Sequence, residues 1–241
     1  MAALIALEGV SKSFGSVRAT DQFSMELAEG EALGVIGPNG AGKSTMFNII
    51  TGAVRPNEGR VLYDGRDITR APAHERCRMG IGRSYQIPHP FANMTVFENL
   101  LVGAAFGGSR SEAACYEDCC KILERTGLVE KANALAGALT LLERKRLEMA
   151  RALATRPRVL LLDEIAGGMT EHECLALVDT IKAIHRTGVS IVWIEHVVHA
   201  LLSVVSRLIV INFGQKLAEG DPQQVMASSE VQEVYMGISA E

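Results

Sequence analysis

The chain has 241 residues, of which 48% are hydrophobic and 22% are charged, and its formal net charge is −4. This length suits one large α/β domain, or one domain carrying an inserted subdomain, with ample residues for a core. The mildly acidic balance predicts no broad basic face, so we expect no nucleic-acid partner. The most apolar late stretch, Val197 to Phe213, is interrupted by polar residues. It falls short of the roughly 20 apolar residues that a membrane span needs.

The first part of the chain predicts a small antiparallel sheet. Residues Leu4 to Glu29 fit two strands joined by a polar turn at Ser13 to Ser16, and Gly59 to Tyr63 fits a third strand. Short strands separated by Gly-, Asp- and Ser-rich turns are typical of antiparallel pairing.

A phosphate-binding loop is the most informative motif of the chain. It lies between a short apolar strand, Ala32–Ile36, and a helical pattern, Thr45–Ile50. The loop matches G-x-x-x-x-G-K-[ST] at every fixed position with Gly37, Pro38, Asn39, Gly40, Ala41, Gly42, Lys43, Ser44 and Thr45. The strand–loop–helix context favours a nucleotide site over a glycine-rich turn with a chance lysine.

The chemistry of this loop predicts ATP and Mg²⁺ as ligands. Its glycines let backbone N–H groups point inward at phosphate oxygens, and the following helix adds its positive end. We expect Lys43 to reach the β- and γ-phosphates and the Ser44 hydroxyl to ligate Mg²⁺.

The middle and last parts of the chain differ in pattern. From Val96 to Ala154 helical periodicity dominates, broken at Gly107-Gly108 and near Gly137, which predicts a helical subdomain. Apolar strands return later as continuous runs, which is typical of buried parallel strands. These runs are Val159–Leu162 and Ser190–Ile194, separated by a helix at Glu171–His185, followed by Leu208–Ile211.

Two adjacent carboxylates end the strand at Leu160 to Leu162. Asp163 is the expected Mg²⁺-side residue, and Glu164 is the expected general base that polarises the attacking water. A strand that ends in Asp-Glu is often only a solvated strand end, but the phosphate loop favours the functional interpretation.

Two single residues follow other predicted strands. Gln86 comes after Ile81–Tyr85, where an amide would sense Mg²⁺ and the attacking water, and His196 comes after Ile191–Glu195, where an imidazole would donate to the γ-phosphate. The alternative for each is a polar residue that simply satisfies a strand end.

Taken together, these motifs resemble the ATP-binding subunit of an ABC transporter over essentially the whole chain. In order they are an aromatic residue (Phe14), the Walker A loop (Gly37–Thr45), a glutamine loop (Gln86), the Walker B strand (Leu160–Glu164) and a switch histidine (His196). The resemblance implies that Phe14 stacks on the adenine ring; the alternative is a core phenylalanine.

The resemblance also implies the fold. We expect an α/β P-loop NTPase core of the ABC/RecA-like type, with a mostly parallel sheet, an antiparallel β subdomain and an inserted helical subdomain. Residues 1–241 would form one ABC ATPase domain. The core would comprise residues 1–86 and 156–241, and the helical subdomain residues 87–155.

Three segments are similar to the ATPases of branched-chain amino acid importers: Pro90–Leu100, Arg144–Leu153 and Glu195–Val198. In that family the ATPase pairs with a second ATPase subunit, identical or different, on two membrane permease subunits fed by a solute-binding protein. The resemblance therefore implies a cytoplasmic protein held at the inner face of the membrane, whose segment Ile87–Val96 contacts the permease.

The ABC signature departs from the family pattern. Leu-Ser-Gly-Gly-Gln is usual, but this chain has Leu139 followed by Thr140, Leu141, Leu142 and Glu143. Thr140 and Glu143 fit a capping box, so they would satisfy the N-terminus of their own helix. One hypothesis is that this segment binds the partner's ATP weakly, and the other is that a backbone shift preserves normal function.

Three further functions stay open at this point. The chain could be a regulatory nucleotide-binding ABC subunit with weak hydrolysis, because of the altered signature. A soluble ABC ATPase of ribosomes or DNA repair usually has two cassettes or long coiled-coil insertions, and neither is found here. A small-molecule kinase with the same loop would need a lid and an acceptor pocket instead of Gln86 and His196.

Overall fold

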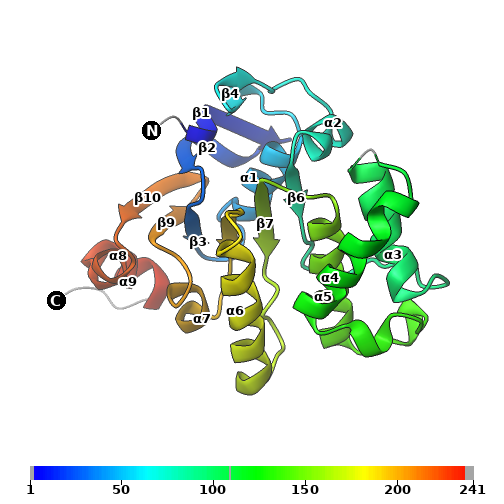
Figure 1. Cartoon of the computed structure of the whole chain (residues 1–241). Coiled ribbons are helices and arrows are strands. Elements are labelled where there is room, and N and C mark those ends of the chain that lie inside the picture. The colour runs from blue at the N-terminus through cyan, green and yellow to red at the C-terminus, as the bar shows by residue number, and fades with distance from the viewer. Residues whose placement is uncertain (1–2, 109, 237–241) are drawn as a thin grey trace. The chain divides into compact units, whose positions relative to one another are not determined.

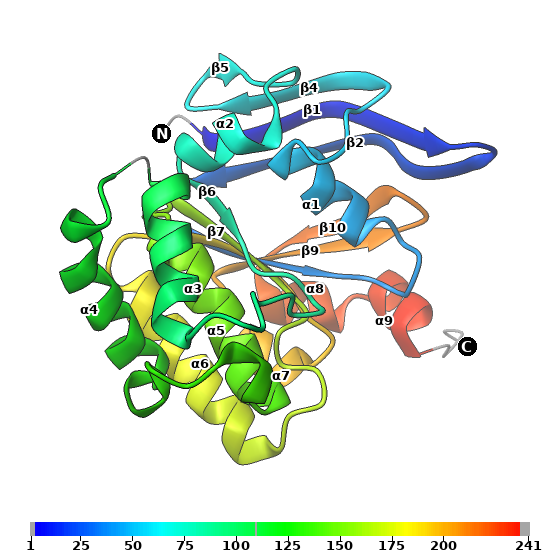
Figure 2. The same cartoon turned by 90° about the vertical axis from the view of Figure 1, so that its right-hand side faces the viewer.

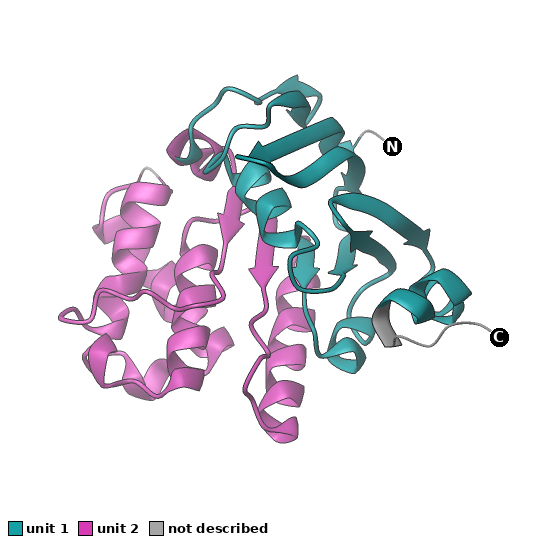
Figure 3. Cartoon of the chain, turned by 180° about the vertical axis from the view of Figure 1, so that it is seen from behind, with its two compact units in different colours: residues 1–73, 190–241 teal, residues 74–189 magenta. Residues whose placement is uncertain are grey.

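The computed structural model describes residues 3–108 and 110–236 (Figure 1). The chain divides into two compact units (Figure 3). Unit 1 comprises residues 1–73 and 190–241, and unit 2 comprises residues 74–189.

Unit 1 contains a four-stranded antiparallel sheet with the order β2-β1-β4-β5 (Figure 2). Its strands are β1 (Ala3–Phe14), β2 (Val17–Ala28), β4 (Glu58–Tyr63) and β5 (Arg66–Asp67). The predicted pair of early strands and the strand at Gly59–Tyr63 are thus confirmed.

A second sheet of unit 1 carries the phosphate loop. Within unit 1 its strand order is β10-β9-β3-β8, with β3 parallel to both neighbours and β10 antiparallel to β9. The strands are β3 (Ala32–Ile36), β8 (Ser190–Ile194), β9 (Arg207–Asn212) and β10 (Gln215–Gly220). Every residue of β3 and β8 is buried, which explains their unbroken apolar sequences.

Four helices belong to unit 1: α1 (Lys43–Thr51), α7 (Val198–Leu202), α8 (Pro222–Ala227) and α9 (Ser229–Met236). α1 follows the phosphate loop directly, as predicted, and contacts β2 (Figure 2).

Unit 2 holds a parallel strand pair and most of the helices. The pair is β6 (Ile81–Arg83) and β7 (Val159–Asp163). The α-helices are α2 (Ala73–Arg78), α3 (Val96–Val102), α4 (Tyr116–Thr126), α5 (Leu141–Ala154) and α6 (Glu171–His185). Shorter turns are the π-helix η1 (Gly103–Gly107) and the 3₁₀ helices η2 (Ala113–Cys115), η3 (Val129–Lys131) and η4 (Ala136–Ala138).

The helices α3, α4 and α5 pack around one apolar core in unit 2 (Figure 1). Val96 and Leu100 of α3, Cys119 of α4, and Leu147 and Ala150 of α5 lie in it. The helical block predicted between Val96 and Ala154 is confirmed. Within the described residues, no helix has the length and apolarity needed to cross a membrane.

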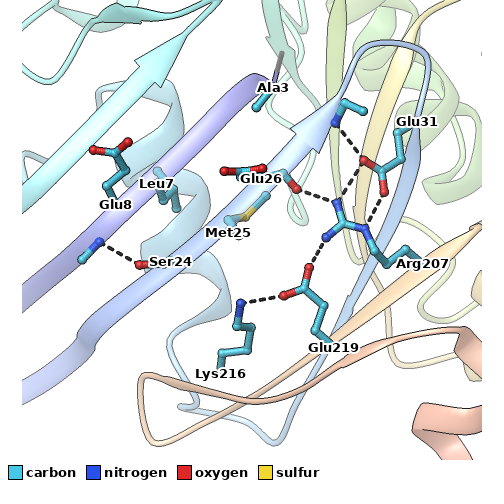
Figure 4. A pocket seen from close by; sticks show the side chains of 12 residues that line it. Ala3, Leu7, Glu8, Ser24, Met25, Glu26, Glu31, Arg207, Lys216 and Glu219 are labelled. Carbon is cyan, nitrogen blue, oxygen red and sulfur yellow. Dashed lines mark hydrogen bonds and ion pairs between the residues drawn. The ribbon is translucent and has the colours of Figure 1, made fainter. Parts of the chain in front are cut away.

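A charged network ties the edge of the antiparallel sheet to β9 within unit 1 (Figure 4). The Arg207 guanidinium binds both carboxylate oxygens of Glu31, at 2.6 and 3.0 Å, and donates to the Glu26 carbonyl at 2.6 Å. It also pairs with Glu219, which Lys216 binds at 2.6 Å. Burial raises the pKa of Glu31, but hydrogen bonds from Arg207 and from Ala28 N outweigh it, so this pKa lies below its ordinary value.

We predict that Arg207→Met lowers the free energy of unfolding by about 1–3 kcal/mol, because several charge-assisted hydrogen bonds in unit 1 are lost. Since Glu31 has a lowered pKa when folded, its contribution is present above its ordinary pKa of 4.5 and is lost as the pH falls through the folded-state pKa. Urea unfolding at pH 7 and at mildly acidic pH measures this. The stability gap between wild type and variant should narrow at low pH, and a constant gap contradicts the prediction.

Candidate functional site

Two glycines of the phosphate loop lie too close to neighbouring backbone for any side chain. A Cβ at Gly37 would come 2.1 Å from the carbonyl oxygen of Ile211 in β9, and one at Gly42 would come 2.2 Å from that of Ala19 in β2. Gly42 also has φ = 104°, in the left-handed region that favours glycine. The loop conformation is therefore fixed by the strands of unit 1 around it.

Lys43 lies across its own loop. Its Nζ donates to the carbonyl oxygens of Gly37 at 2.7 Å and Pro38 at 3.0 Å, and the residue is only 4% exposed. Ser44, the next residue of α1, is exposed. A buried ammonium and an accessible hydroxyl thus occupy the two positions that the motif assigns to phosphate and metal.

Asp163, at the end of β7, forms a buried ion pair that the sequence did not reveal. Arg83 Nη2 lies 2.6 Å from Asp163 Oδ2, and the two side chains are 7% and 5% exposed. The same guanidinium stacks on Tyr85, with Cζ 4.8 Å from the ring centroid. Arg83 ends β6, the strand that runs parallel to β7, so the pairing of these strands places its charge beside Asp163.

The structure brings together two predicted catalytic residues, Gln86 and Glu164. Gln86 Nε2 donates to Glu164 Oε2. Gln86 is exposed and lies three residues beyond β6, because this strand ends at Arg83 rather than at Tyr85 as predicted. Glu164 has φ = 47°, an uncommon value for a residue with a side chain. Such strain directly after a strand is a frequent feature of functional positions.

Phe14 and His196 belong to unit 1. Phe14 ends β1 and is 50% exposed, so the core interpretation is wrong; Lys12 Nζ lies 5.3 Å from its ring centroid. His196 is exposed and follows the fully buried Glu195. Glu195 Oε1 accepts hydrogen bonds from the backbone N–H of His196 at 2.9 Å and of Val197 at 3.3 Å, which fixes the backbone at this strand end.

The signature segment forms the predicted capping box. Thr140 is the N-cap of α5, and its Oγ1 accepts from Glu143 N at 3.3 Å. Glu143 Oε2 accepts from Thr140 N at 2.8 Å and from Thr140 Oγ1 at 3.1 Å, while Lys131 Nζ lies 3.2 Å from Glu143 Oε1. The bond from Thr140 N, together with Lys131, holds the pKa of Glu143 below its ordinary value. Leu141 is 57% exposed.

The oxygen donors at these positions fit Mg²⁺ better than a metal that prefers nitrogen or sulfur. Ser44, Gln86 and Asp163 offer a hydroxyl, an amide oxygen and a carboxylate, the hard ligands that Mg²⁺ takes together with waters and substrate phosphates. Among residues 3–108 and 110–236, no group of three or more His, Cys, Asp and Glu side chains has the arrangement of a metal site.

Comparison with known proteins identifies the family. The sequence profile described as "ABC transporter" matches residues 20–167. The chain belongs to the ABC transporter family. Its fold agrees: a solved cassette of an ABC transporter in its ADP conformation, MJ1267, superimposes with a TM-score of 0.90 at 32% identity, over 99% of this chain and 100% of that one. A dimeric bacterial cassette, MJ0796, matches with a TM-score of 0.83 at 25% identity, over 90% and 98%.

Curated relatives match over almost their whole length. The high-affinity branched-chain amino acid transport ATP-binding protein BraF of Pseudomonas aeruginosa is 35% identical over 97% of this chain and 98% of its own. LivG of Salmonella typhimurium, described in the same words, is 34% identical over 97% and 98%. The chain is thus an ATP-binding subunit with the ABC ATPase fold, a nucleotide-binding protein and an ATPase, as predicted.

We predict that Arg83→Met lowers both stability and ATP turnover, because breaking a buried ion pair costs about 3–5 kcal/mol. Arg83→Lys is the matched control, since it keeps the positive charge and should lose less. Thermal unfolding and phosphate release measure the two effects. Wild-type stability and turnover in Arg83→Met would show that the pair has neither role.

Proposed function

We propose that this ABC ATPase drives the import of branched-chain amino acids or related small solutes. The observation that carries the proposal is the near full-length similarity to BraF and LivG, with an intact phosphate loop in this chain. We further propose that residues 1–241 form one cassette, with a helical subdomain at residues 87–155.

We assign roles residue by residue. Lys43 and the backbone of Gly37–Thr45 bind the ATP phosphates, and Phe14 stacks on the adenine. Glu164 accepts the proton of the attacking water, Gln86 orients this carboxylate through their hydrogen bond, and His196 donates to the γ-phosphate. Ser44, Asp163 and Gln86 would hold Mg²⁺, partly through water, and the bound ion would neutralise phosphate charge.

The partners follow from the same family. We propose a dimer with a second ABC ATPase, identical or different, whose nucleotide would be contacted by Thr140, Leu141, Leu142 and Glu143. Integral permease subunits would bind near Ile87–Val96, and a solute-binding protein would act through them. The protein would then be peripheral at the cytoplasmic face of the membrane.

The alternatives gain no support. No comparison favours a regulatory subunit with weak hydrolysis, and the Gln86–Glu164 hydrogen bond gives the expected base a partner suited to positioning it. The near full-length match to ABC transporter ATP-binding proteins likewise gives no support to a small-molecule kinase.

We predict that Glu164→Gln lowers turnover of the assembled complex by about 10²–10⁴-fold, because a general base is lost, while nucleotide binding persists. Lys43→Ala should weaken binding itself, since it removes the phosphate-facing charge. Phosphate release and titration with a fluorescent ATP analogue separate the two. Glu171→Gln, at an exposed position of α6, is the control. Full turnover in Glu164→Gln would remove Glu164 as the base.

We predict that Glu143→Gln strengthens ATP-dependent dimerisation by about 2–5-fold. The substitution removes the repulsion between the Glu143 carboxylate and the phosphates of the partner's ATP, about 0.3–1 kcal/mol at the N-terminus of α5. Leu142→Gly should act in the same direction by freeing the backbone. Lys131→Ala is the opposing control, since Lys131 offsets the charge of Glu143. Sedimentation of the Glu164→Gln background with ATP measures dimerisation. If neither Glu143→Gln nor Leu142→Gly dimerises more strongly than the parent, the altered signature does not weaken dimerisation.

A further inference from the structure

Helix α5 contacts the segment from Ile87 to Val96 at the backbone of His89. Arg151 Nη1 donates to the His89 carbonyl oxygen at 2.9 Å, and the His89 backbone N–H lies close enough to the Glu148 carboxyl to lower its pKa. The two side chains are one helical turn apart and bind each other, with Arg151 Nη1 3.1 Å from Glu148 Oε2. One ion pair therefore holds the His89 carbonyl by a hydrogen bond and lies beside the His89 N–H.

Glu148 has an unusual position for an acidic residue. It is only 6% exposed, and burial raises the pKa of its carboxyl, an effect that Arg151 and the His89 N–H partly offset. A buried carboxylate is retained only where it is paired and hydrogen-bonded. Here its partners are Arg151 and the backbone of the segment, so packing of the helical core alone does not account for it.

A second set of contacts holds the next part of the segment. Asn99 of α3 is fully buried; its Oδ1 accepts from Phe91 N at 2.9 Å, and its Nδ2 donates to Phe91 O at 3.1 Å. The Arg151 guanidinium also covers the Phe91 ring, with Cζ 4.9 Å from the centroid. The segment is thus fixed at residues 89 and 91 from two helices.

The backbone of the segment is held by hydrogen bonds, whereas two of its large apolar side chains are exposed. Ile87 is 66% exposed and Phe91 45% exposed, although both are large and apolar. A loop that served only to connect Gln86 to α3 would not need a fixed backbone and exposed apolar side chains together. This combination is typical of a preorganised contact surface.

The other end of the same helix reaches the signature. α5 begins directly after Thr140, and Arg144 Nη2, in its first turn, donates to the Gly137 carbonyl at 2.8 Å. Gly137 N in turn donates to Ala92 O at 3.0 Å. The segment is therefore connected to α5 at two levels, near the signature through Gly137 and two turns later through Glu148 and Arg151.

We propose that Glu148 and Arg151 form a clamp that positions the segment Ile87–Val96 for the permease, so that solute-driven stimulation of ATP hydrolysis depends on it. The inference rests on the proposed function, because it needs a permease at this segment. The clamp residues are positioning residues: they act on the docking segment and take no part in hydrolysis.

The first test needs only the chain itself. Hydrogen exchange should accelerate at the amides of His89 and Phe91 in Arg151→Met and in Glu148→Gln, and should stay unchanged in β3. Arg125→Met, at an exposed position of α4, is the matched control. Unchanged exchange at His89 in both variants overturns the clamp whatever the permease does.

The second test uses the complete complex in vesicles, with leucine-loaded binding protein as the stimulus. Arg151→Met should keep ATPase activity without the binding protein and lose about 2–30-fold of the stimulation, the range by which such contacts alter coupling. Arg151→Lys should recover part of it, since it keeps a donor to the His89 carbonyl. Equal stimulation in Arg151→Met and wild type overturns the proposal.

The two proposals fail differently. If wild type does not co-purify with the permease, or if no branched-chain amino acid or related small solute, loaded on the binding protein, stimulates it, the import function is wrong, and the role of the clamp falls with it. If wild type is stimulated and both clamp variants respond equally, only the clamp is wrong. If Arg151→Met fails to fold, Glu148→Gln decides, because it keeps the side-chain volume and removes the charge.

Discussion

The close approach of backbone to backbone at Gly37 and Gly42 is the constraint on which the nucleotide chemistry depends. Each glycine faces a carbonyl oxygen of a different strand, Ile211 of β9 and Ala19 of β2, at a distance that excludes a Cβ. The loop is shaped from outside by two sheets of unit 1, rather than by its own turn preferences. A flexible glycine loop would have to be ordered by the nucleotide, whereas this one presents its N–H groups and Lys43 in a fixed frame, which lowers the entropy lost on binding.

The two adjacent carboxylates at the end of β7 lie in different environments. Asp163 and Glu164 are adjacent in sequence, yet one is buried against Arg83 and the other bonds to the exposed Gln86. Asp163 is the last residue of β7, whereas Glu164 lies beyond the strand with φ = 47°, so the two side chains leave the backbone in different directions. Asp163 therefore pairs with the positive charge of Arg83, whereas Glu164 bonds to the neutral amide of Gln86. A base needs the second environment, because a strong positive partner would hold its proton affinity down.

The sequence predicted what local patterns encode and missed what strand and helix pairing creates. The helix after the phosphate loop, the strand that ends at Asp163 and the Thr140–Glu143 capping box are short-range features, and the structure contains all three. The extent of β6 was overestimated: the Ser84 N–H still donates to the Leu161 carbonyl at 2.9 Å, but residue pairing with β7 ends at Arg83. No partner for Arg83 or Arg151 was predicted from the sequence. Their partners lie 80 and 62 residues away, so only the fold reveals them.

Helix α5 shows why these long-range contacts matter for a motor. A helix of 14 residues is about 21 Å long and behaves as a stiff rod, so a force at one end displaces the other. Its N-terminus carries the altered signature, and its third turn carries Glu148 and Arg151, which hold the segment after Gln86. Gln86 itself bonds to Glu164. The segment therefore lies between two covalent or hydrogen-bonded routes, one to Glu164, the proposed general base, and one to α5. An event at Ile87–Val96 would act on both routes at once, because His89 is only three residues from Gln86 and is bonded directly to Arg151 of α5.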